Sequence, residues 1–239
     1  NAGKTSSMKE AALELNYWCF ENATYRTTDD RTANPMTVLR CAYGRCGEES
    51  TFATTAFRSV GIPTRQIYTP RWPHCDDNHA WVEVWCDGDW HYLGACEPEA
   101  VLDKGWFTAA ASRAMIIHSR MFSDYVENEE IVTHEGLTTV CNELSRYADT
   151  QTFSVTVTEN GQPLSGVTLR IELLNYSEFF PISTLVTDEN GKASITLGLG
   201  DLHIHALKDG RFITRLVDTR KEPSVQIDFT NASACQTTE

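Results

Sequence analysis

The chain has 239 residues, a net charge of −13 and 41% hydrophobic residues, which suits one large or two medium globular domains with buried cores. The negative charge argues against nucleic acid backbones and anionic membrane surfaces as partners. No run of 18 apolar residues occurs, so the sequence predicts no membrane-spanning segment. These features leave the oligomeric state open.

Three helices and three strands are predicted in the first part of the chain. Apolar residues recur at helical spacing in residues 8–22 and 46–60, and Pro35 can open a helix that ends near residue 43. Strands are predicted at 64–69, 79–86 and 90–93, and a further one at 113–118. Residues 124–149 are acidic and mixed, and we expect a weak helix followed by a linker there.

The pattern changes near residue 150, where alternating polar and apolar residues begin. Such runs start near residues 153, 166, 193, 202, 212 and 225, and turn signals such as Asn160-Gly161 and Asn190-Gly191 separate them. Short strands at this spacing predict a β-sandwich. We therefore expect an α+β domain over residues 1–149 and an all-β domain over residues 150–239.

Eight cysteines occur, and one of them has a distinctive setting. Most read as buried small hydrophobic residues or stand alone, and their spacing forms no small-domain disulfide framework. Cys46, in Gly44-Arg-Cys-Gly-Glu-Glu-Ser50, stands where a turn feeds a predicted helix. The N-terminus of a helix stabilises thiolate and can also bind an oxyanion. Cys46 is therefore a candidate nucleophile.

A histidine follows at the head of the strand predicted at 79–86. His79 begins the run His-Ala-Trp-Val-Glu-Val-Trp85, and a rigid strand is a suitable support for a general base. A thiol nucleophile needs such a base to take its proton and return it to the leaving group. The order of Cys46 and then His79 predicts a thiol enzyme that attacks amides.

These motifs resemble the core of the transglutaminase-like superfamily, which has a papain-like cysteine fold. The resemblance rests on the segments around Cys46, Gly61-Ile-Pro-Thr-Arg65, the strand from His79 and Trp90-His-Tyr-Leu93. It is strongest for bacterial transglutaminase-like domain proteins and more distant for peptide:N-glycanases. It implies helices packed on an antiparallel sheet, with Cys46 as nucleophile and His79 as base. The later strands are similar to Ig-like or carboxypeptidase-regulatory modules, which usually position a catalytic domain.

The third residue of the expected triad departs from the family pattern. The family usually has an aspartate, which orients the histidine, where this chain has Gly94. Glu97 follows three residues later and can reach back, so we predict that it replaces the aspartate. Asp76, Asp77 and Asp89 are other candidates for this role.

The segment before His79 is predicted to face the substrate. Trp72, His74, Asp76 and Asn78 are the candidate contact residues, although the tryptophans of this chain also fit a core role. His74, Cys75 and His79 are of the types that bind zinc, so a metal-dependent hydrolase is an alternative. No second ligand cluster or calcium loop accompanies them, and the preferred interpretation has no metal and no cofactor.

The sequence thus predicts a thiol acyl-transfer enzyme that acts on the amide bonds of proteins, peptides or glycopeptides. Hydrolysis is favoured over cross-linking, because no amine-binding site is evident. The alternative is a decayed scaffold of the same fold that binds protein or carbohydrate without catalysis, which the glycine at position 94 suggests. The β-domain favours a secreted or envelope-associated bacterial protein.

Overall fold

A computed structural model describes residues 2–27, 32–123 and 129–235. The chain forms two compact units. The first contains Asn1–Thr69, Asn78–Ala109 and His118–Met121, and the second contains Pro70–Asp77, Ala110–Ile117 and Phe122–Glu239. Each unit is therefore built from segments that are not contiguous in the sequence.

The helices of the first unit begin and end close to their predicted positions. They are α1 (Met8–Asn22), α2 (Pro35–Cys41) and α3 (Cys46–Ser59). The side chain of Ser7 accepts a hydrogen bond from the Glu10 N–H and so caps α1. Gly61, at φ 86°, follows the end of α3 in a conformation that favours glycine.

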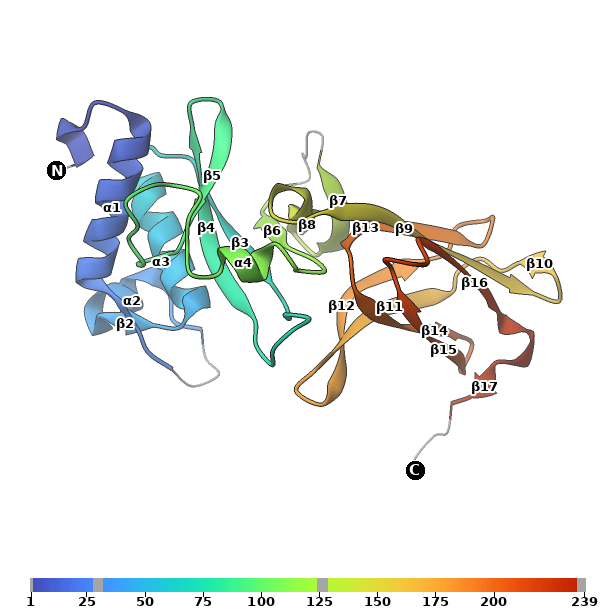
Figure 1. The fold of residues 1–239 in the computed structure, drawn as a ribbon. Helices are drawn as coiled ribbons and strands as arrows, with labels where there is room; N and C mark the ends of the chain where they lie inside the picture. Colours follow the sequence, from blue (N-terminus) through green and yellow to red (C-terminus); the bar gives the residue numbers. More distant parts are fainter. Residues whose placement is uncertain (1, 28–31, 124–128, 236–239) are drawn as a thin grey trace. The chain divides into compact units, whose positions relative to one another are not determined.

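The helices cover one face of an antiparallel sheet (Figure 1). Within the first unit the strand order is β5 (Asp89–Leu93), β4 (His79–Cys86), β3 (Thr64–Thr69) and β6 (His118–Met121). Val82, Val84 and Leu93 pack with Phe52 and Phe57 of α3 in a shared core. The short strands β1 (Thr24–Tyr25) and β2 (Tyr43–Gly44) form a separate parallel pair. This arrangement confirms the α+β core.

Two of the predictions in the middle of the chain are wrong. Only His118 of the strand predicted at 113–118 lies in a strand, because β6 begins there and runs on to Met121. The helix and linker predicted at 124–149 are instead a hairpin of β7 (Glu130–Glu135) and β8 (Thr138–Asn142), followed by the 3-10 turn η2 (Leu144–Arg146). β-Branched residues and a turn at Gly136, with φ 63°, favour this hairpin. Residues 124–128 lie outside the described residues.

Two sheets of the second unit pack face to face around one core, as the alternating pattern predicts. Their strands are β9 (Thr150–Glu159), β10 (Gln162–Pro163), β11 (Thr168–Asn175), β12 (Glu178–Val186), β13 (Lys192–Gly198), β14 (Asp201–Lys208), β15 (Arg211–Asp218), β16 (Ser224–Asp228) and β17 (Ser233–Ala234). In one sheet β9 pairs with β10, with β13 and with β16. The other sheet has the order β12–β11–β14–β15–β17. Phe153, Ile171 and Ile204 are fully buried in their shared core. Strand β12 is the longest one that the sequence pattern missed.

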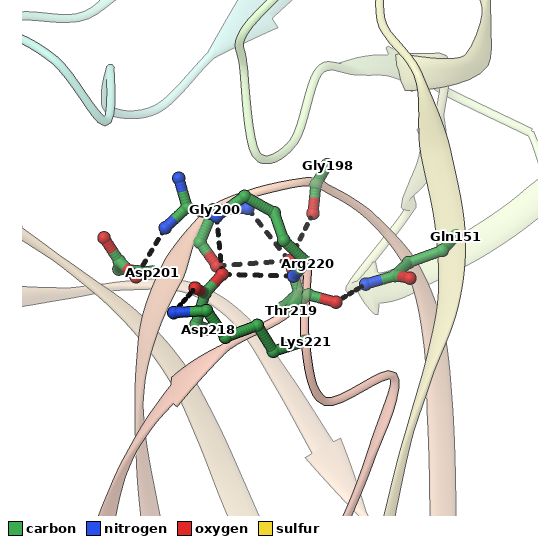
Figure 2. Close-up of polar contacts among 8 residues, drawn as sticks. All are labelled: Gln151, Gly198, Gly200, Asp201, Asp218, Thr219, Arg220 and Lys221. Carbon is green, nitrogen blue, oxygen red and sulfur yellow. Dashed lines mark hydrogen bonds and ion pairs between the residues drawn. The ribbon is translucent and has the colours of Figure 1, made fainter.

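A buried threonine joins two ends of the second unit's strands (Figure 2). The hydroxyl of Thr219 accepts from the Gly200 N–H at 2.9 Å and donates to the Gly198 carbonyl at 3.0 Å. The Gln151 side chain donates to the Thr219 carbonyl. Arg220 pairs with Asp218 at 2.5 Å and with Asp201 at 3.0 Å. This network satisfies polar groups where β13 and β15 end and β14 begins.

Candidate active site

Cys46 is the first residue of the 14-residue helix α3 and opens onto a cavity of about 380 Å³. The thiol is half-buried, and the positive end of the helix dipole favours its thiolate form. Its neighbours come from α3, the loop before it, and the sheet. The other described lining residues are Thr32, Arg45, Gly47, Glu48, Thr51, Gln66, Tyr68, Asn78, His118 and Arg120.

The first turn of α3 contains two glutamates, and negative charge on either one would oppose a thiolate at Cys46. The buried carboxylate of Glu48 accepts from the N–H of Arg45 at 2.8 Å and from the N–H of Ala33 at 2.7 Å. Burial, together with the charges of Glu97 and Glu48, raises the pKa of Glu49 to about 8. Glu49 is therefore mostly neutral at pH 7 and opposes a thiolate little.

Strand β3 is tied to the turn that carries the nucleophile. The Gln66 amide donates to the Gly47 carbonyl at 3.0 Å and to the Ser50 hydroxyl at 2.7 Å. These bonds place Gln66 on the sheet face that meets α3. Tyr68 lies two residues farther along the strand and shares that face.

His79, the predicted base, is buried among aromatic rings. Its ring centroid lies 4.6 Å from that of Trp106, 4.9 Å from that of Phe107 and 5.7 Å from that of Trp81. Burial lowers the pKa of His79 to about 4, so the imidazole is neutral at pH 7. Within the described part of the chain, Nε2 of His79 has no hydrogen-bond partner.

The strand register places His79 on the sheet face opposite Tyr68. Tyr68 pairs with Ala80 of β4, and Thr69 pairs with His79; directly paired residues share a face, and adjacent ones alternate. His79 accordingly packs with Trp81 on its own face. It is not among the described residues that line the cavity at Cys46, although its neighbour Asn78 is.

Glu97 lies where the aspartate of the family pattern would project. A Cβ atom built on Gly94 would lie 2.4 Å from Oε2 of Glu97 and 2.9 Å from its Cβ. The indole N–H of Trp106 donates to the two Glu97 oxygens at 3.1 and 3.0 Å. Burial raises the pKa of Glu97, and the hydrogen bond from Trp106 partly opposes this shift. The structure therefore links Glu97 to His79 through the ring of Trp106.

The loop that carries Glu97 is fixed to helix α1. The buried Asn16 side chain donates to the Gly94 carbonyl at 2.9 Å and accepts from the Cys96 N–H at 3.0 Å. Cys96 has φ 59°, which the two hydrogen bonds help to hold. A hydrogen bond with Cys19, followed by burial, raises the pKa of the Cys96 thiol.

Two side chains of the cavity lie outside the sequence motifs around Cys46 and His79. His118 and Arg120 come from β6, where Tyr68 pairs directly with His118. His118 therefore shares the sheet face of Tyr68 and Gln66 that meets α3. The predicted strand at 113–118 contained His118, but no local signal indicated that it would pair with β3.

The other predicted substrate residues divide between the units. Asn78 lines the cavity at Cys46, whereas Trp72, His74 and Asp76 belong to the second unit. There the Asp76 carboxylate accepts from the Tyr176 N–H at 2.7 Å, and the Trp72 carbonyl accepts from Asn175 at 2.9 Å. Among the described residues, no group of three or more histidine, cysteine or acidic side chains is placed to hold a metal ion.

Comparison with known families agrees with the signature around Cys46. Residues 1–95 match the family model of the transglutaminase-like superfamily. The match covers 95 of the 239 residues. Residues 118–121, which supply His118 and Arg120, lie outside the matched segment.

Several solved structures are weakly similar to the chain. A protein of Cytophaga hutchinsonii described as a proposed cysteine protease is 16% identical, over 59% of this chain and 54% of that one, with a TM-score of 0.36. A structure described as a TGase is 17% identical, over 45% of this chain and 31% of that one, with a TM-score of 0.35. Red sea bream transglutaminase is 12% identical, over 98% of this chain and 55% of that one, with a TM-score of 0.35. This chain thus spans 55% or less of each.

No curated protein sequence matches the chain. In the ranges that the structure describes, no helix is long and apolar enough to cross a membrane.

Proposed function

We propose that this transglutaminase-like protein is a cysteine-dependent amide hydrolase, with Cys46 as nucleophile, His79 as base and Glu97 as the acid that orients His79. The observation that carries the proposal is the Cys46 thiol, which lies at the start of α3 and opens onto a cavity. Cys46 also lies within the segment that matches the superfamily model. The helix end favours the thiolate and can bind the oxyanion that forms on the substrate.

The chemistry follows from these groups. Sγ of Cys46 bonds to the amide carbonyl carbon, and its proton passes to His79. The C–N bond then breaks, and the amine leaves with the proton from His79. Water attacks the thioester and releases the acid. Peptides, proteins and glycopeptides are the proposed substrates, with Asn78 in contact.

A non-catalytic binding role is the second candidate, and the packing around His79 favours it. Trp106 and Phe107 contact the imidazole, and the cavity is lined by His118 instead. In that case Cys46 marks a binding cavity, and ligand binding occurs without turnover.

Quantitative alkylation separates the two candidates. The protein is treated with iodoacetamide, and mass spectrometry follows each cysteine, with the exposed Cys41, Cys75 and Cys235 as internal references. An enzyme predicts at least about tenfold faster reaction at Cys46, and a panel of fluorogenic peptides should be cleaved by the protein but not by its Cys46→Ala variant. Equal reaction at Cys46 and the references, with no cleavage, would reject catalysis.

A further inference from the structure

Strand β6 contributes two side chains to the Cys46 cavity that the proposed triad does not use. His118 and Arg120 are separated by one residue on the strand, so they share the face that meets α3. They lie beyond the segment that matches the superfamily model.

His118 has an unsatisfied polar atom in the wall of the cavity. The side chain is 6% exposed, and its Nδ1 has no partner among the described residues. Its ring packs edge-on against Tyr68, with centroids 5.4 Å apart. Burial, and then the charge of Arg120, lowers the pKa of His118 to about 4. A neutral imidazole can donate one hydrogen bond to a bound ligand.

Arg120 supplies the positive charge. It is exposed, and no ion pair joins it to another residue in the described ranges. The other lining arginine, Arg45, lies 3.6 Å from the carboxylate of Glu48, so its charge is compensated. In a chain with a net charge of −13, a guanidinium in this cavity that forms no ion pair with the described residues favours an anionic ligand.

We propose that His118 and Arg120 form a subsite for a carboxylate group of the amide substrate. Guanidinium binds carboxylate through two parallel N–H groups, and the imidazole adds a third donor. The inference rests on the proposed function and makes it more specific, because the preferred amide carries a carboxylate close to the scissile bond. That carboxylate is an acidic side chain or a chain terminus.

Two alkylating agents test the subsite without knowledge of the substrate. Iodoacetate carries a carboxylate and iodoacetamide carries a neutral amide, and both transfer their carbon to the thiolate with loss of iodide. The rate ratio of iodoacetate to iodoacetamide is measured at Cys46 by mass spectrometry. We expect this ratio to exceed that of the exposed Cys41 and Cys235 by about tenfold.

Variants assign the preference to the two residues. Arg120→Gln and His118→Asn should each lower the ratio at Cys46, whereas Arg40→Gln, an exposed arginine of α2 outside the cavity, should not. An unchanged ratio in Arg120→Gln overturns the subsite. The subsite is also overturned if Arg120→Gln lowers the ratio but a folded His118→Asn variant does not, because the positive charge of Arg120 alone then explains the preference. Slow reaction of Cys46 with iodoacetamide itself would instead reject the proposed nucleophile.

Peptides then distinguish the source of the carboxylate. Matched peptides carry glutamate or glutamine beside the scissile amide, and each has either a free or an amidated C-terminus. Preference for glutamate identifies a side-chain carboxylate, and preference for the free end identifies a chain terminus. Equal cleavage of all four would overturn the subsite while leaving the amide hydrolase intact.

Discussion

The carboxylate of Glu97 lies over Gly94, in the space that a side chain at position 94 would occupy. The two sites cannot both carry side chains in this arrangement, because a Cβ at 94 would lie 2.4 Å from the Glu97 oxygen. The position of the Glu97 carboxylate therefore depends on the absence of a side chain at position 94.

Gly94→Ala tests this relationship. The new methyl group should displace Glu97 from Trp106, and we expect turnover to fall by about tenfold or more, as for other enzymes whose histidine loses its orienting acid. Peptide cleavage and the alkylation rate of Cys46 measure the effect. Gly3→Ala is the control, since nothing lies within 4 Å of the Cβ built there. Full activity in Gly94→Ala would show that the position of Glu97 does not matter.

Returning the acid to the earlier position is a second test. Glu97→Gln should be impaired, because a neutral amide cannot stabilise an imidazolium. We expect the double variant Gly94→Asp with Glu97→Gly to recover a large part of the lost turnover, since glycine at position 97 leaves room for a side chain at position 94. Failure of Glu97→Gln to reduce turnover would contradict the assigned role.

Glu49 should make stability depend on pH. Its pKa of about 8 in the folded protein exceeds that of an unfolded glutamate, so between about pH 4.5 and 8 the folded state holds a proton that the unfolded state releases. The free energy of unfolding therefore falls as pH rises through this window, on the order of a few kcal/mol.

Glu49→Gln should remove this dependence, because the amide mimics the neutral acid. Urea titrations at pH 4.5, 6, 7.5 and 9 should show stabilisation of the variant that grows with pH. Glu14→Gln, at an exposed glutamate of α1, serves as the control. Parallel profiles for the protein and its Glu49→Gln variant would contradict an elevated pKa.

Removal of Trp106 should raise the pKa of His79. Because burial lowers this pKa to about 4, Trp106→Ala should shift it toward the ordinary value of about 6.5, while the pKa of His118 stays near 4. NMR titration of the two rings measures both. Between pH 4 and 6.5, His79 is neutral in the folded protein but protonated in the unfolded chain. The free energy of unfolding therefore falls as pH falls through this window.

Asn16→Ala should destabilise the first unit and loosen the loop that carries Glu97. The buried side chain makes two hydrogen bonds to that loop, and leaving their backbone partners unsatisfied costs about 1–3 kcal/mol for each group. Urea denaturation measures the loss. Asn22→Ala removes only an exposed bond to the Trp18 carbonyl, and a comparable loss there would contradict the role of the loop.

Local patterns were sufficient for much of the fold. The spacing of apolar residues and the stop at Gly61 placed α3, and the signature around Cys46 and His79 identified the superfamily segment. Arg65, which ends the motif that begins at Gly61, pairs with Glu83 at 2.7 Å. Each of these features depends on residues that are close in the sequence or on a specific motif.

Long-range pairing explains what the sequence did not reveal. His118 joins the cavity because β6 pairs with β3, about fifty positions earlier in the chain, and no local signal specifies such a partner. Acidic residues are not typical of strands, and those of β7 favoured the prediction of a helix despite the β-branched residues of the hairpin. The turn at Gly136, with φ 63°, favours a hairpin over the predicted helix.

The second unit is assembled from three stretches of chain. Met115 and Ile116 are fully buried in the sandwich core, and the Gly198 N–H donates to the Met115 carbonyl at 3.1 Å. Asn175 likewise binds the carbonyls of Trp72 and Cys75 at 2.9 and 2.8 Å. The sandwich therefore depends on residues made well before its own strands.

This dependence sets an order for biosynthesis. The helices and sheet of the first unit are complete once Met121 has left the ribosome, whereas residues 70–77 and 110–117 must wait for β9 to β16 before they can be buried. A nascent chain that stops near residue 149 would leave Met115 and Ile116 exposed to solvent and to chaperones.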